Sequence, residues 1–218
     1  MIEAVAAEPG KGQDRIIPLS EKPFKETSPG FRLYQPESRE FPDRKVIFRI
    51  QNSFRSKVCQ FGNWRRLGLV DPKDSFVIAI NGARIDDLGA PDGFPYGVRA
   101  MFALGAQVLS VPVNMKTGAA KSEDAETYIQ YQGKVQKQSG SSVDSDCFMS
   151  KKFKVVSGII YTQCYYADTI RVDAKDIALI KNPFARNPVD DLRLDFGKEF
   201  FKVDSPDGTG YRIDSRDS

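Results

Sequence analysis

Residues 43–67 carry the feature that most limits the folds open to this chain, an apolar stripe with the period of an α-helix. The apolar side chains recur at spacings of three and four residues, and they are Ile47, Ile50, Phe54, Val58 and Phe61. Because a helix turns by about 100° per residue, these side chains share one narrow face. The segment therefore predicts an amphipathic helix that packs on a core.

Residues 75–81 follow this helix as a strongly apolar segment, with an unbroken run from Phe76 to Ile80. A run without polar alternation suits a strand that is covered on both faces. Residues 1–7 are small and apolar with a single acid, and they predict the end of another buried strand. The fold class that we expect is therefore α/β, a mixed sheet with a long packing helix.

The remainder of the chain predicts shorter elements. Residues 8–41 predict a long loop with one extended piece at 30–34. We expect a helix at 96–104, strands at 107–113, 126–136, 155–162 and 176–181, a polar loop with one helical turn over 139–152, and a terminal hairpin from 200–203 and 210–213. This organisation indicates an α/β core over residues 1–113 and a β-rich C-terminal extension over 114–218, packed on the same domain.

The absence of histidine from all 218 residues restricts the chemistry of the chain. It excludes Ser-His-Asp and Cys-His triads, histidine zinc sites and histidine general bases. Catalysis would need carboxylates, lysine, a hydroxyl, a thiol or an oxygen-bound metal such as magnesium. The three cysteines, Cys59, Cys147 and Cys164, form no CxxC pair and predict reduced thiols.

The apolar runs are much shorter than the roughly 20 residues that a membrane-spanning helix needs. The N-terminus has an acid at Glu3 and lacks the basic start of a secretory signal. We therefore expect a cytoplasmic protein with no membrane partner, and the sequence leaves its oligomeric state open.

The charge of the chain is concentrated in the predicted helix. The net charge is only +3, whereas the stretch from Asp43 to Leu69 holds seven basic residues and one acidic residue. One flank of this helix carries donor groups within about 100° of each other, at Arg49, Ser53, Ser56, Lys57 and Gln60. Such a row is typical of a solvated basic face, or of a surface that contacts the phosphates of a nucleic acid. For the second alternative the candidate contacts are Arg49, Arg55, Arg65 and Arg66.

Five segments resemble, in order, a group of uncharacterised bacterial proteins with a PD-(D/E)xK, restriction-endonuclease-like fold. They are Glu3-Ala4-Val5-Ala6-Ala7 with Gly10-Lys11-Gly12, the helix segment from Phe48 to Val58, the strand from Phe76 to Gly82, the strand from Val156 to Tyr161, and the turn from Asn182 to Pro188. These segments are spread from Glu3 to Pro188, so the resemblance covers most of the chain.

The resemblance implies a partial nuclease core in which Glu3 is a metal ligand for Mg²⁺. The lysine that polarises water in such nucleases normally follows two residues later, where this chain has Val5. Lys57 on the helix can take over that role. Gln60 and Trp64 resemble the "QxxxY" pair of some of these nucleases, with Trp in place of Tyr. The catalytic residues implied are therefore Glu3, Lys57 and Gln60.

A second departure concerns the upstream aspartate of these nucleases, which would lie before Met1, so we expect an N-terminally truncated nuclease domain. Three functions remain open at this point. The first is a nuclease-like protein that cleaves nucleic acid phosphodiesters with a metal ion. The second is a non-catalytic module that binds nucleic acid or a protein, and the third is an inactive fragment of a nuclease-fold protein.

Overall fold

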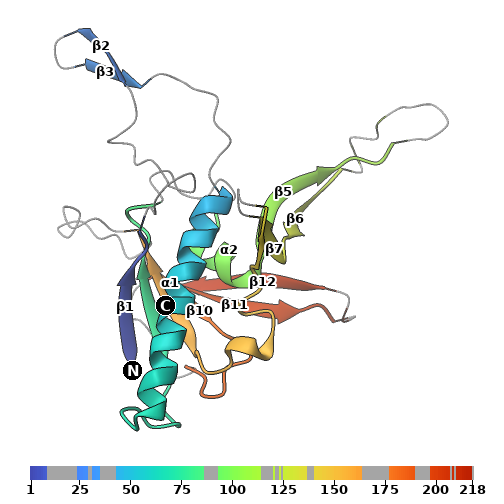
Figure 1. The fold of residues 1–218 in the computed structure, drawn as a ribbon. Helices are drawn as coiled ribbons and strands as arrows, with labels where there is room; N and C mark the ends of the chain where they lie inside the picture. The colour runs from blue at the N-terminus through green and yellow to red at the C-terminus, as the bar shows by residue number, and fades with distance from the viewer. Residues whose placement is uncertain are drawn as a thin grey trace.

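The structure is a computed structural model, shown in Figure 1. It describes residues 1–8, 24–28, 31–34, 43–85, 93–113, 120, 123, 125–136, 140–163, 177–189, 197–206, 208 and 210–217.

A mixed six-stranded sheet with the order β1-β4-β9-β10-β11-β12 forms the centre of the molecule. Its strands are β1 (Ile2–Ala6), β4 (Val77–Asn81), β9 (Gly158–Thr162), β10 (Ile177–Lys181), β11 (Lys198–Asp204) and β12 (Tyr211–Asp217). The first three strands are parallel to one another, and β10 runs antiparallel to β9. The coarse expectation of an α/β fold with a mixed sheet is therefore confirmed.

The helix α1 (Asp43–Arg66) connects β1 to its parallel neighbour β4 and lies against the sheet (Figure 1). The predicted apolar face is buried, since Ile47, Ile50, Phe54 and Phe61 are each at most 3% exposed. The ring of Phe61 stacks on that of Phe76, which directly precedes β4, with centroids 3.9 Å apart. Burial of this stripe fixes which side of α1 faces the sheet and which side remains available for chemistry.

The short helix α2 (Tyr96–Phe102) packs beside α1 and close to Tyr161 of β9. A Cβ atom on Gly97 would lie 2.5 Å from Cγ of the Tyr161 ring, and a Cβ atom on Gly82 would collide with the same side chain. Two glycines therefore make room for one buried tyrosine, which is 1% exposed. This close approach explains why glycine occupies both positions 82 and 97.

Four strands between residues 104 and 144 form two small antiparallel sheets beside the main one. They pair β5 (Leu104–Ser110) with β6 (Glu126–Tyr131), and β7 (Lys134–Gln136) with β8 (Ser142–Asp144). The single strand predicted at 126–136 is therefore wrong, because the chain leaves one ladder at Gln132 and enters another at Lys134. The polar segment after residue 139 contains β8, and the predicted helical turn is a 3-10 helix, Lys151–Phe153.

Two expectations for the N-terminal part need correction. The strand β1 lies at the edge of the sheet and is not a buried strand, since Ile2 is 57% exposed. The extended piece expected at 30–34 is β3 (Phe31–Tyr34), and it pairs with a strand that was not predicted, β2 (Phe24–Ser28).

The terminal hairpin is longer than expected, and β11 joins the main sheet beside β10. The strands that follow residue 114 in that sheet therefore extend the layer that β1 and β4 begin. Of the helices that the structure describes, none combines the length and the apolarity of a membrane-spanning segment.

Candidate functional site

Three residues that were singled out from the sequence meet between β1 and α1. Lys57 Nζ donates a hydrogen bond to Glu3 Oε1 at 2.6 Å and to Gln60 Oε1 at 3.1 Å. Lys57 and Gln60 are three positions apart on α1 and so project from the same side of the helix. Glu3 faces them because its side of β1 points toward α1, while Ile2 and Ala4 point away. We call Glu3, Lys57 and Gln60 the polar centre.

The polar centre is partly shielded from water. The side chains of Lys57 and Glu3 are 17% and 24% exposed. An ion pair in such a position is screened less by salt and solvent than a fully exposed one. Among the residues that the structure describes, the third N–H of Lys57 and the second oxygen of Glu3 have no partner. One donor and one acceptor therefore remain to contact a ligand or a water molecule.

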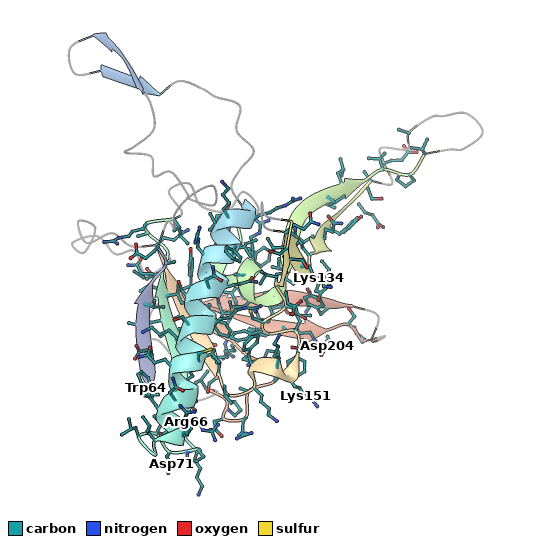
Figure 2. The ribbon with its side chains drawn as sticks, viewed as in Figure 1. Trp64, Arg66, Asp71, Lys134, Lys151 and Asp204 are labelled. Carbon is teal, nitrogen blue, oxygen red and sulfur yellow. The ribbon has the colours of Figure 1, made fainter. Side chains whose placement is uncertain are left out.

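Trp64 lies one helical turn beyond Gln60 and is half-buried. Its side chain packs against the hydrophobic core. The Trp in place of the Tyr of "QxxxY" thus contributes an apolar side chain to the core, and it adds no hydroxyl beside Gln60. The Trp64 position is marked in Figure 2.

The four arginines predicted to contact nucleic acid occupy different surroundings. The Arg55 guanidinium donates to the backbone oxygen of Asp144 at 2.7 Å and lies 5.8 Å from the Phe153 ring centre, so it holds β8 against α1. Arg49 is half-buried beside the Phe48 ring. Neither side chain is directed freely into solvent.

The other two arginines lie at the C-terminal end of α1. Arg66 is exposed and donates to Asn63 Oδ1 at 3.0 Å. Arg65 lines a shallow hollow that Arg186 also lines. Arg65 and Arg66 are therefore better placed for a large anionic partner than Arg49 and Arg55 are.

The predicted magnesium site can be compared with the ligands that the polar centre offers. It brings together one carboxylate, Glu3, and one amide oxygen, Gln60. Mg²⁺ needs a near-octahedral set of oxygen ligands, usually including one or two carboxylates. Within the described ranges no group of three or more His, Cys, Asp or Glu residues is arranged to hold a metal. The polar centre therefore does not by itself make a magnesium site, and Glu3 as a metal ligand stays a prediction.

Sequence reasoning missed the roles of two asparagines, which it interpreted only as turns before proline. Asn182 Nδ2 donates to the backbone oxygens of Phe153 and Val156 at 3.1 and 2.8 Å. Asn187 Nδ2 donates to those of Pro72 and Asp74, each at 2.9 Å. These side chains tie together three loops, residues 67–75, 150–157 and 182–189. The Asn-Pro pairs were the only local signal, and the partners are at least 26 residues away in the chain.

A second charged cluster, also not predicted, lies on the C-terminal strands. The Glu199 carboxylate accepts from Arg216 at 2.6 Å and lies 3.2 Å from Lys181 Nζ. Burial, which acts to raise the pKa of Glu199, is outweighed by the hydrogen bonds and charges of Arg216 and Lys181, so its pKa is lowered. This cluster joins β10, β11 and β12 and is a structural feature of the sheet.

Comparisons with protein-family models, with curated proteins and with solved structures find no match to this chain. The resemblance to PD-(D/E)xK nucleases therefore rests on the sequence segments alone and stays a prediction.

Proposed function

We propose that this chain acts on nucleic acid phosphodiesters as a nuclease-like protein, with Glu3, Lys57 and Gln60 at its reactive centre. The observation that carries this proposal is the contact between Lys57 and both of its expected partners across two separate elements. The strand-helix-strand unit of β1, α1 and β4 agrees with the restriction-endonuclease-like core that the sequence resembles. That unit occurs in many α/β proteins, so the polar centre supplies the functional argument.

The chemistry follows from the groups that remain open. Lys57 can donate its third N–H to a non-bridging oxygen of the phosphate and stabilise the negative charge that grows there. The free oxygen of Glu3 can accept a proton from a water molecule as the water oxygen bonds to phosphorus. The bond from phosphorus to the leaving oxygen breaks, and that oxygen takes a proton from solvent. Gln60 holds the Lys57 ammonium in place through its Oε1 atom.

A cleavage assay on supercoiled and linear DNA, with and without Mg²⁺, tests the proposal. We expect Lys57→Ala to lose cleavage, because the variant lacks the cation at the phosphate. The matched control is Lys134→Ala, since Lys134 is an exposed lysine on β7 outside the polar centre (Figure 2). Circular dichroism of both variants shows whether they fold. An unchanged rate in the folded Lys57→Ala variant would overturn the assignment.

A second candidate is a non-catalytic module that binds nucleic acid. The polar centre contains one carboxylate, whereas metal-dependent phosphoryl transfer normally uses more than one, and this difference favours the second candidate. Salt-dependent DNA binding by a folded protein that cleaves DNA under no metal condition would support this candidate over the first.

A further inference from the structure

The end of the molecule where α1 terminates carries an excess of positive charge. The end of α1 and the three loops that Asn182 and Asn187 tie together hold seven basic residues. Lys152 pairs with Asp144, and we call the other six the basic platform: Arg65, Arg66, Lys73, Lys151, Lys154 and Arg186. The same segments hold two acids, Asp71 and Asp74. Figure 2 shows Arg66 and Asp71 at the end of α1 and Lys151 on the 3-10 helix.

The loops of the basic platform are held to one another by backbone and side-chain hydrogen bonds. The Arg186 backbone N–H donates to the backbone oxygen of Lys154 at 2.7 Å. Ser75 Oγ donates to the backbone oxygen of Pro188 at 3.1 Å. The backbone positions of the basic residues on these loops are therefore fixed relative to one another, which lowers the entropy that would be lost on binding a large anion.

Two arginines of the platform face the same hollow. Arg65 comes from α1 and Arg186 from the loop after β10, and both line it together with Asn187 and the apolar side chain of Phe61. Asp74 also lines the hollow, yet within the described part of the chain it forms no ion pair with either guanidinium. The lining of the hollow thus includes two arginines and one aspartate, and this excess of positive charge favours an anion there.

The platform and the polar centre lie along one helix. Phe61, which lines the hollow, directly follows Gln60 of the polar centre. Consecutive helical residues project about 100° apart, so the shared position along α1 does not place the two regions on one face. The separate basic residues of the platform suit a chain of phosphates better than a single small anion. The planar guanidinium of arginine matches the geometry of phosphate oxygens, which favours Arg65 and Arg186 as its contacts.

We propose that the basic platform binds the phosphate backbone of a nucleic acid, with Arg65 and Arg186 on one phosphate. This inference rests on the proposed function and deepens it, because it assigns the surface that positions the substrate. It differs from the prediction made from the sequence, since Lys73, Lys151, Lys154 and Arg186 join the surface only through the fold. Leu67 and Leu69 are 68% and 69% exposed at the same end, and an anionic membrane is the competing partner.

Fluorescence anisotropy of the full chain with a labelled DNA duplex, at several salt concentrations, tests this surface. The test variant is Arg65→Gln with Arg186→Gln. The matched control is Arg84→Gln with Arg212→Gln, which removes the same charge from two exposed arginines that are paired with Glu8 and Asp214. Each phosphate contact contributes about 0.9 to the slope of log affinity against log salt.

We expect the test variant to bind about tenfold more weakly at 0.1 M salt and to lose about 0.9 from this slope, because the two arginines contact one phosphate. The control should change affinity by less than about twofold. Equal losses in both double variants, or an unchanged slope in the test variant, would overturn the proposal. Binding of the wild type to phosphatidylserine vesicles but not to the duplex would overturn it in favour of a membrane.

The failure of this inference can be separated from the failure of the proposed function. Lys57→Ala should lose cleavage even at saturating DNA, and it should lower the salt slope by no more than the value of one phosphate contact, about 0.9. The Arg65→Gln, Arg186→Gln variant should bind more weakly but still cleave at saturating DNA. Platform-dependent binding without any cleavage supports the surface and rejects the nuclease activity.

Discussion

Lys57 Nζ lies 2.6 Å from Glu3 Oε1, although the two residues are 54 positions apart in the chain. The contact joins the middle of α1 to the edge strand β1. It pairs the lysine and the carboxylate that the sequence had indicated as candidate catalytic residues. It also makes a stability prediction that is independent of any activity.

We expect a coupling energy of about 1 kcal/mol between Glu3 and Lys57. The pair is only partly exposed, so solvent screens it less than an ordinary surface pair. The measurement is a double-mutant cycle with Glu3→Gln and Lys57→Met, followed by urea unfolding. The exposed pair of Arg84 and Glu8 provides the control cycle, with an expected coupling of about 0.3 kcal/mol. Equal coupling in the two cycles would contradict the shielding seen at Lys57.

The same Gly→Ala change should have opposite effects in the two helices. In α1 a Cβ atom on Gly62 meets nothing within 4 Å, so Gly62→Ala should stabilise the protein by about 0.5–1 kcal/mol through helix propensity. In α2 a Cβ atom on Gly97 lies 2.5 Å from Tyr161 Cγ, so Gly97→Ala should destabilise it by about 1–3 kcal/mol. Urea unfolding of both variants checks the signs. A stabilised Gly97→Ala variant would show that α2 does not pack on Tyr161 in this way.

The lowered pKa of Glu199 predicts that the free energy of unfolding depends on pH. Its pKa in the folded protein is lower than the ordinary value of 4.5, so the unfolded chain binds the proton more tightly. The ionised carboxylate therefore stabilises the fold above pH 4.5, and this stabilisation is lost as the pH falls below that value through the lowered pKa. Glu199→Gln should cost about 2 kcal/mol at pH 7, a value discounted because Arg216 is 56% exposed. Unfolding at pH 7 and pH 3 should show the difference between variant and wild type shrinking at the lower pH.

Two cysteines should differ strongly in reactivity. Burial raises the pKa of Cys147 to about 12, whereas Cys59 is exposed on α1. At pH 8 the thiolate fraction of Cys147 is then on the order of 10⁻⁴, and the thiolate is the reactive form. Iodoacetamide treatment followed by peptide mass spectrometry should show Cys59 modified and Cys147 protected until urea unfolds the protein. Rapid labelling of Cys147 in the native state would contradict its burial beside Arg55.

The elements that were predicted well are those whose signal is local. The helix α1 and the strands β4, β9 and β10 have apolar patterns that depend on neighbouring residues only, and periodicity identifies them. The prediction failed at 126–136, where an alternating segment divides between two ladders at Gln132. Alternation indicates extended backbone but does not say which partner strand the backbone pairs with. The strands β2 and β8 were missed because both are short and polar.

Sequence reasoning was enough to exclude histidine chemistry and to identify the faces that the main elements bury. The absence of histidine and the apolar stripe of α1 need no knowledge of the fold. The fold is needed to see which groups meet: Lys57 contacts Glu3, Glu199 contacts Lys181 and Arg216, and Arg65 and Arg186 line one hollow. These contacts join residues far apart in the chain, and their geometry depends on strand order and helix placement, which arise from packing the whole core at once.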